Sequence, residues 1–319
     1  MNASRKALYP SIAIAVVFAL VPLFTKRNDL INLLVLIFLY VTLAQSWNVI
    51  AGYTGQVSLG HAAFFGLGAI ATRFLWVWGA PFLLAFLAGG IVAVIFALII
   101  GHPALRLRGI YFAIGTLALA QILKITVGNV LPVVADLPAP YVAAYSLVPR
   151  YYLCLGLAVI IVAVVSLLSR AKVGLGMMAV REDEEAAGAA GVNTFRQKVM
   201  AFAISSFFAG LAGGAFAFYQ VSYYHDLPFN PTWTFAALLI TFVGGVGTIV
   251  GPVVGAFFYV IFQEVFVRTF PELHVFVFGV LFILVILLLP GGLVELAARI
   301  RGLMTPKTSR QDPHAGFSN

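Results

Sequence analysis

Long runs of apolar residues are the feature that most restricts how this chain can fold. The run Val275–Leu289 (VFVFGVLFILVILLL) contains no charged side chain, and it does not alternate between apolar and polar residues. Lipid offers no hydrogen-bonding partner, so a chain that crosses a bilayer must satisfy its own backbone groups, as a helix or a closed barrel. Barrel strands alternate over segments of about ten residues. We therefore predict an all-α, polytopic integral membrane protein.

Composition supports a protein that is surrounded by lipid. The 319 residues are only 9% charged, whereas about 25% of the residues in a soluble domain are charged. We predict about ten helical segments, with the region 233–268 divided at its glycines near residue 246. The other segments are 8–24, 30–50, 58–79, 81–101, 108–128, 151–169, 199–221 and 273–290. They form one transmembrane domain over residues 1–304, and a polar, flexible tail follows over 305–319.

The distribution of basic residues predicts the orientation of these segments. With the N-terminus inside, 13 of the 19 lysine and arginine residues fall on the inner side, and cytoplasmic loops carry such an excess. Both termini and the 170–198 loop are therefore predicted to be cytoplasmic. The net charge of +8 then reflects topology and contact with anionic lipid, and we expect no nucleic-acid partner.

The segment Arg170–Lys198 is the largest polar interruption between the apolar runs. It holds nine of the thirty charged residues and is flanked by predicted spans, so it must lie in water. Strong helix formers predict a short helix over Arg181–Ala190, with Gly191 placed to end it and Asn193 placed to cap the next helix. Such a helix, turn and helix could dock a soluble partner. The alternative is an ordinary solvated surface.

Two glycine-rich segments, Gly52–Gly68 and Gly244–Gly255, interrupt the apolar pattern. Paired Gly-interrupted segments in the two halves of a transporter indicate a translocation path, and glycine also permits close helix packing without substrate contact. For His61 we consider both substrate contact and a packed side chain bonded to a neighbouring carbonyl. The candidate path residues are Gly52, Gly55, Gln56, Ser58, Gly60, His61, Gly244, Gly247 and Gly251.

No catalytic chemistry is indicated. The lone cysteine, Cys154, lies in an apolar run, and no metal-ligand spacing or Ser/His/Asp arrangement is present. A phosphate-binding G-x-x-x-x-G-K-[ST] motif is also absent. We predict no catalytic, cofactor or metal site in this chain, and we expect that it is not an enzyme and does not hydrolyse ATP itself.

The loop and the glycine-rich segments carry a family resemblance. The pattern Glu185-Ala-Ala-x-x-x-Gly191 resembles the EAA loop of ABC importer permeases, and nearly the whole chain resembles branched-chain amino-acid permeases of the LivM type. The matching stretches are AGYTGQVSLGHAAFFGLG (51–68), LRLRGIYFAI (105–114), AVREDEEAA (179–187) and FVGGVGTIVGPVVG (242–255).

The resemblance implies a permease subunit of an ATP-driven ABC importer in a bacterial cytoplasmic (inner) membrane. Its implied partners are a second, related permease subunit, two cytoplasmic ATPase subunits that bind ATP and Mg, and an external substrate-binding protein. The residues implied in coupling to the ATPase are Arg181, Glu182, Glu185, Ala186, Ala187 and Gly191.

Leucine, isoleucine and valine are the expected solutes, and relatives of this type also carry urea, short amides and other organic solutes. The remaining alternatives are a purely structural membrane scaffold and a secondary transporter or channel that needs no ATPase. Transporters and channels of this kind usually place carboxylates in mid-span, and none lies clearly there in this sequence.

Overall fold

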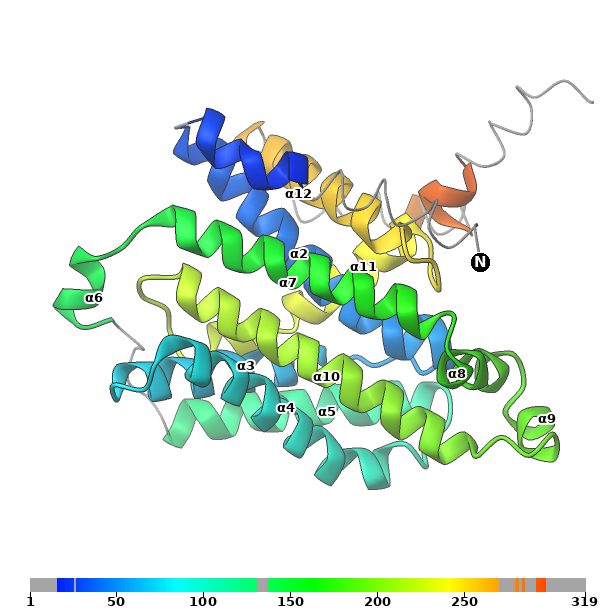
Figure 1. The fold of residues 1–319 in the computed structure, drawn as a ribbon. Helices are drawn as coiled ribbons and strands as arrows, with labels where there is room; N and C mark the ends of the chain where they lie inside the picture. The colour runs from blue at the N-terminus through cyan, green and yellow to red at the C-terminus, as the bar shows by residue number, and fades with distance from the viewer. Residues whose placement is uncertain are drawn as a thin grey trace, which may run out of the picture.

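The computed structural model describes residues 16–25, 27–130, 137–269, 279–280, 283–284 and 291–296. The predicted segment 273–290, apart from 279–280 and 283–284, and the predicted tail 305–319 lie outside these ranges. Every regular element in the described ranges is helical, which confirms the predicted all-α fold (Figure 1). After a helical stretch over 16–24, the elements are α2 (Asn28–Thr54), α3 (His61–Val77), α4 (Phe82–Ala104), α5 (Ile110–Val130), α6 (Ala139–Ala143), α7 (Leu147–Leu168), α8 (Lys172–Glu182), α9 (Glu184–Ala189), α10 (Thr194–Tyr219), the 3-10 turn η1 (Leu227–Phe229), α11 (Thr232–Gly244) and α12 (Gly251–Thr269).

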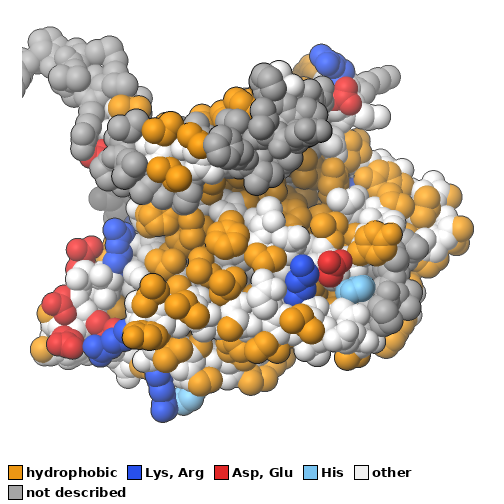
Figure 2. Space-filling model, turned by 180° about the vertical axis from the view of Figure 1, so that it is seen from behind, with side chains coloured by type: hydrophobic (Ala, Val, Ile, Leu, Met, Phe, Trp, Pro, Cys, Tyr) orange, Lys and Arg blue, Asp and Glu red, His pale blue; other side chains and the backbone are white. Residues whose placement is uncertain are grey.

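Five described helices, α2, α4, α5, α7 and α10, are long and apolar enough to cross a membrane. Shorter apolar helices are formed by α3, α11 and most of α12. Figure 2 shows hydrophobic side chains spread over the flank of the molecule, with the largest group of acidic and basic side chains at the end formed by α8 and α9 and a few others elsewhere. The structure therefore has the helix lengths and the surface of a polytopic membrane protein, as predicted.

The apolar helices lie close to the predicted segments, although several of their limits differ by a few residues. α11 ends at Gly244 and α12 begins at Gly251, which confirms the predicted break near residue 246. α3 was expected to begin near residue 58 but begins at His61, because residues 55–60 form a non-helical connection after α2. Both glycine-rich segments thus contain a break in helical structure.

α2 is the central helix of the fold. It packs against α7, α10, α11 and α12, and it also contacts α8. Figure 1 shows α3, α4, α5 and α10 on one side of α2, and α12 on the other. Every residue from 37 to 54 is buried, including the polar Gln45 and Asn48. Because buried polar side chains need hydrogen-bonding partners, polar groups from other elements must form hydrogen bonds with this half of α2.

Glycine allows α3, α4 and α10 to pack at backbone distance. A Cβ atom added at Gly68 would overlap the carbonyl oxygen of Gly210, and one added at Gly213 would overlap that of Phe65. A Cβ atom at Gly89 of α4 would lie 2.7 Å from the carbonyl oxygen of Gly68. Small residues at helix contacts are typical of membrane bundles, which gain stability from close van der Waals packing. This packing holds α10 against the first glycine-rich segment.

Two buried arginines bind the C-terminal end of α10. Arg73 donates from Nη2 to the carbonyl oxygens of Ala217 and Gln220, both at 2.6 Å, and Arg150 donates from Nε to that of Phe218 at 2.7 Å. The last carbonyls of a helix lack partners within the helix and carry partial negative charge, so guanidinium groups suit this position. α10 is therefore fixed at the end remote from α8 and α9.

The connection between α10 and α11 runs back along α3. The Tyr223 hydroxyl donates to the carbonyl oxygen of Ala69 at 3.3 Å, and Phe229 lies against Gly66. The chain then reaches the start of α3, where the Ala62 N–H donates to Thr234 Oγ1 at 2.8 Å. α11 consequently begins beside the first turn of α3, and its far end lies near the second half of α2.

Candidate functional site

The predicted coupling loop forms two helices, and the single helix expected over 181–190 is wrong. Asp183 has an extended backbone (φ −156°, ψ 113°) between α8 and α9. Its carboxylate accepts hydrogen bonds from the N–H groups of Glu185 at 2.9 Å and Ala186 at 3.0 Å. Aspartate caps helix N-termini well because it satisfies N–H groups that have no partner within the helix. The side chain of Asp183 therefore starts a new helix where propensity alone would continue the first.

The turn after α9 agrees with the sequence prediction. Gly191 has φ +86°, a conformation that glycine adopts without steric cost. The N–H of Gly191 donates to Gly188 and that of Val192 donates to Ala187, both at 3.0 Å, which is the bonding pattern of a Schellman motif. Asn193 then caps α10, accepting from the Arg196 N–H at 2.9 Å. The predicted stop at Gly191 and the predicted cap at Asn193 are both confirmed.

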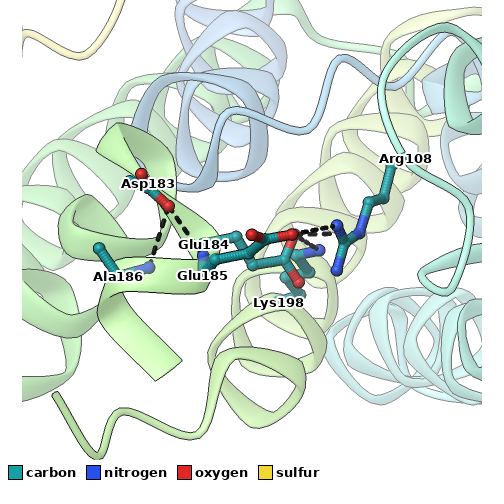
Figure 3. A network of polar contacts seen from close by, with 6 residues as sticks. All are labelled: Arg108, Asp183, Glu184, Glu185, Ala186 and Lys198. Carbon is teal, nitrogen blue, oxygen red and sulfur yellow. Dashed lines mark hydrogen bonds and ion pairs between the residues drawn. The ribbon is translucent and has the colours of Figure 1, made fainter. Parts of the chain in front are cut away.

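A buried ion pair ties α9 to α10 (Figure 3). Lys198 Nζ lies 2.6 Å from Glu184 Oε2, and the side chain of Lys198 is only 2% exposed. Arg108, from the turn between α4 and α5, lies 3.2 Å from Glu185 Oε1 and 3.9 Å from Glu184 Oε2, but its own side chain is 66% exposed. The position of α9 is therefore coupled chiefly to α10. Sequence analysis did not select Lys198 or Arg108, because no local periodicity relates either residue to α9.

The candidate coupling residues divide into outward and inward groups. Glu182 and Glu185 have side chains that are 81% and 83% exposed, and Ala186 and Gly191 are exposed as well. Ala187 is 5% exposed and packs inward. The exposed set lies at the charged end of the molecule, where a soluble partner could reach it. Contact with such a partner stays a prediction for each of these residues.

The two glycine-rich segments meet beside α2. Asn48 accepts from the Gly247 N–H at 2.8 Å and donates to the carbonyl oxygen of Thr248 at 2.9 Å, while Gln45 donates to that of Ile249 at 2.6 Å. A Cβ atom at Gly52 would lie 2.7 Å from the Gly247 nitrogen. These bonds hold the 245–250 break against the second half of α2, and they supply the partners that the buried amides of α2 require.

Gly244 and Gly251 lie at the two ends of this break. A Cβ atom at Gly244 would overlap the carbonyl oxygen of Gly251, and one at Gly255 would overlap that of Ile240. α11 and α12 therefore run antiparallel in contact, as a helical hairpin whose turn is the 245–250 break. Four of the predicted path glycines, Gly52, Gly244, Gly247 and Gly251, are thus brought to one place.

Arg181 connects the coupling loop to these glycines. Its Nη1 donates to the carbonyl oxygen of Gly52 at 2.7 Å and lies directly against Gly247. Gly55 lies beneath the same side chain, since a Cβ atom added there would be 3.6 Å from Arg181 Cγ. The sequence assigned Arg181 to the coupling loop and the glycines to the path, and the structure places them in contact.

Two other polar candidates, Ser58 and His61, belong to a buried cluster between α2, α3, α5 and α10. His61 is fully buried, with Nε2 2.8 Å from Ser205 Oγ and Nδ1 3.3 Å from Ser58 Oγ. Ser205 donates in turn to the carbonyl oxygen of Ser46 at 2.6 Å. A Cβ atom at Gly60 would lie 2.6 Å from the Thr116 carbonyl oxygen. His61 therefore has the surroundings of a packed histidine, although its ring is bonded to hydroxyl groups; its contact with a substrate stays a prediction.

Gln56 differs from its neighbours in the first break. It is only 8% exposed, and its Oε1 atom has no hydrogen-bonding partner in the described part of the chain. A buried acceptor without a partner costs about 1–3 kcal/mol. Among the polar candidates of this segment, Gln56 is therefore the one with free capacity for a hydrogen-bond donor.

The described residues contain no group of three or more His, Cys, Asp and Glu side chains that could hold a metal ion. Cys154 is buried, with its thiol inside the apolar core. The arrangement around the breaks is built from backbone carbonyls, amides and glycines. Such groups can line a path for a small solute and can change contact partners when helices move.

Comparisons with known proteins agree with this arrangement. A family model described as "Branched-chain amino acid transport system / permease component" matches residues 29–286. The chain is similar to the "High-affinity branched-chain amino acid transport system permease protein LivM" of Escherichia coli (strain K12), with 27% identity over 322 residues that cover 89% of this chain and 74% of the relative. A protein of the same description from Salmonella typhimurium is 27% identical over 321 residues, with the same coverage. No solved structure matches the chain. Because the family match extends over both breaks and the α8–α9 loop, the chain belongs to the permease component family of branched-chain amino acid transport systems.

Proposed function

We propose that this permease is the membrane subunit of an ATP-driven importer that carries leucine, isoleucine and valine across a bacterial cytoplasmic membrane. The observation that carries the proposal is the α8–α9 loop, which presents exposed acidic and small residues at one end of the bundle and touches both helix breaks through Arg181. The printed descriptions of the two relatives, which name branched-chain amino acid transport, support the choice of solute.

The proposed assembly contains the subunits that bind ATP and deliver the solute. Two ATPase subunits bind ATP and Mg at the cytoplasmic face and contact the α8–α9 loop through Glu182, Glu185 and Ala186. A second, related permease completes the membrane unit, and an external binding protein delivers the solute. In this orientation both termini and the 170–198 loop lie in the cytoplasm, which agrees with the excess of basic residues on that side.

The ion pair offers a route from the ATPase to the membrane helices. Movement of α9 would pull on Glu184, and the buried Lys198 would transfer that movement to the N-terminal part of α10. α10 is fixed at its other end by Arg73 and Arg150, so it would tilt and not slide. Such a tilt changes the packing of α10 on α2 and α3, which hold the first break.

The distribution of carboxylates favours an ATP-driven importer over an ion-coupled transporter. Of the chain's eleven acidic residues, Asp29 and Glu264 are the ones that lie in the described spanning or shorter apolar helices. Asp29 is in the first turn of α2, where it faces the positive end of the helix dipole. Ion-coupled transporters usually carry carboxylates at mid-depth, so the pattern supports an external energy source.

We expect purification from the native membrane in a mild detergent to recover an ATPase and a second permease with this chain. Mass spectrometry identifies the components. The contact is then located with Glu182→Cys in a Cys154→Ala background, which should cross-link to the ATPase. Leu83→Cys, 62% exposed at the start of α4, is the control and should not. Recovery of the chain alone, together with no ATPase cross-link from position 182, would replace this proposal with an autonomous transporter or channel.

We expect Gln56→Leu to lower leucine uptake roughly tenfold or more while leaving the folded protein intact. The free Oε1 atom suits the ammonium group of an amino acid, and a hydrogen bond to a charged group contributes about 1.5–3 kcal/mol. Uptake of labelled leucine into cells is measured with valine, urea and acetamide as competitors, and Gln121→Leu on the half-buried face of α5 is the matched control. Wild-type uptake in Gln56→Leu would remove Gln56 from the path.

A further inference from the structure

Arg181 lies at the end of α8 and reaches away from the loop toward the membrane helices. Its side chain is 39% exposed, whereas those of Glu182 and Glu185 in the same loop are 81% and 83% exposed. The other group near its guanidinium is Glu182 Oε1, 3.9 Å from Nε, which is a weak contact between partly solvated charges. The hydrogen bond to Gly52 therefore determines where the guanidinium lies.

The carbonyl oxygen of Gly52 is a suitable acceptor for this charge. Gly52 is in the last turn of α2, where the final four carbonyls have no partner within a regular helix. The neighbouring carbonyl of Ala51 is taken by the N–H of Gly55 at 3.1 Å. Arg181 supplies a charged donor to Gly52 at 2.7 Å, at the end of the helix that carries partial negative charge. The contact thus completes the C-terminus of α2.

Gly247, in the 245–250 break, lies against the same guanidinium. Its φ of +78° suits glycine, and a Cβ atom there would overlap Arg181 Nη1 and lie 3.1 Å from the Gly52 oxygen. The N–H of Gly247 is held by Asn48 of α2. One guanidinium therefore lies where α8, the end of α2 and the 245–250 break converge.

We infer that Arg181 is a positioning residue that links α8 to both helix breaks, so that displacement of α8 removes one of the contacts that hold the end of α2 to the 245–250 segment. We name the contact of Arg181 with Gly52 and Gly247 the Arg181 clasp. The force that displaces α8 depends on the proposed function, because it would come from the ATPase. The clasp itself is a contact within this chain. In this assignment Arg181 makes contacts within the permease. The exposed Glu182, Glu185 and Ala186 are the residues that contact the ATPase.

The clasp is tested on the purified chain in lipid nanodiscs, without any ATPase, by hydrogen–deuterium exchange. Arg181→Ala should raise the exchange rate of peptides covering 51–57 and 245–251 at least threefold. Arg181→Lys, which keeps one charged donor, should give an intermediate rate. Lys172→Ala removes an exposed cation from the other end of α8 and should match the wild type. Unchanged exchange in Arg181→Ala would overturn the clasp; Arg181→Gln repeats the test if the alanine variant does not fold.

A second measurement separates the clasp from the proposed function. In the assembled transporter, Arg181→Ala should lower leucine uptake at least fivefold while ATP hydrolysis continues, because α8 would move without carrying the breaks. Faster exchange in the nanodisc, combined with transport that needs no ATPase, would keep the clasp and reject the ATP-driven importer. Unchanged exchange, combined with ATP-dependent uptake, would reject the clasp and keep the importer.

Discussion

Replacing Gly68 by valine is expected to remove nearly all folded protein from the membrane. A Cβ atom at this position would overlap the Gly210 carbonyl oxygen and lie 2.5 Å from the Gly210 carbonyl carbon. The obstacle is the backbone of α10, which cannot rotate aside as a side chain could. Overpacking a core usually costs about 1–3 kcal/mol, and forcing two helix backbones apart would exceed that range, against a total stability of about 5–15 kcal/mol.

The Gly68 prediction is checked by the yield of monodisperse protein after detergent extraction and by its thermal unfolding midpoint. Gly156→Val is the matched control, since a Cβ atom there would have no neighbour within 4 Å and the residue also lies in a membrane-spanning helix. Gly156→Val should keep wild-type yield. A wild-type yield for Gly68→Val as well would show that α3 and α10 are not held at backbone distance.

Breaking the ion pair between Lys198 and Glu184 is expected to have the second largest effect, and the two single variants should differ. Glu184→Gln leaves the ammonium group of Lys198 buried without its carboxylate, whereas Lys198→Met leaves Glu184 with a side chain that is 25% exposed and partly solvated. Removing one member of a buried pair costs about 3–5 kcal/mol, because an unpaired charge remains in a poorly solvated site. We expect Glu184→Gln to reach this range and Lys198→Met to fall below it.

The double variant Glu184→Gln/Lys198→Met should recover most of the lost stability, since it leaves no unpaired buried charge. Unfolding is followed by a thermal or denaturant assay in detergent. Arg108→Met is the control, because its side chain is 66% exposed and an exposed ion pair contributes about 0–1 kcal/mol. A Glu184→Gln protein as stable as Arg108→Met would show that Lys198 and Glu184 do not form a buried pair.

The local features of the fold could be predicted because each depends on residues close together in the chain. Apolar runs of spanning length indicated the membrane helices, and the glycines near residue 246 indicated the break between α11 and α12. Gly191 and Asn193 were recognised as the end of one helix and the cap of the next, since both act through hydrogen bonds within five residues. The helix expected over 181–190 was divided, because the side-chain cap of Asp183 outweighed the helix propensity of its neighbours.

Family membership could also be recognised from the sequence, through four motifs that lie in order between the spans. The solute, the orientation, the subunits of the assembly and the individual path residues stay predictions. Gln56 illustrates the difference: the sequence selected it for its polar side chain within a glycine-rich segment, and the structure adds that its acceptor is free, which only uptake measurements can connect to a substrate.

The sequence by itself determined that this is a helical membrane protein with two glycine-rich breaks and a charged loop, because hydropathy, caps and turns are properties of short stretches. Only the tertiary structure decided that these parts meet. Arg181 and Gly52 are 129 positions apart, and Asn48 and Gly247 are 199 apart. No periodicity relates residues at such separations; their contact follows from the way α8, α11 and α12 pack on α2, where buried polar groups must find partners.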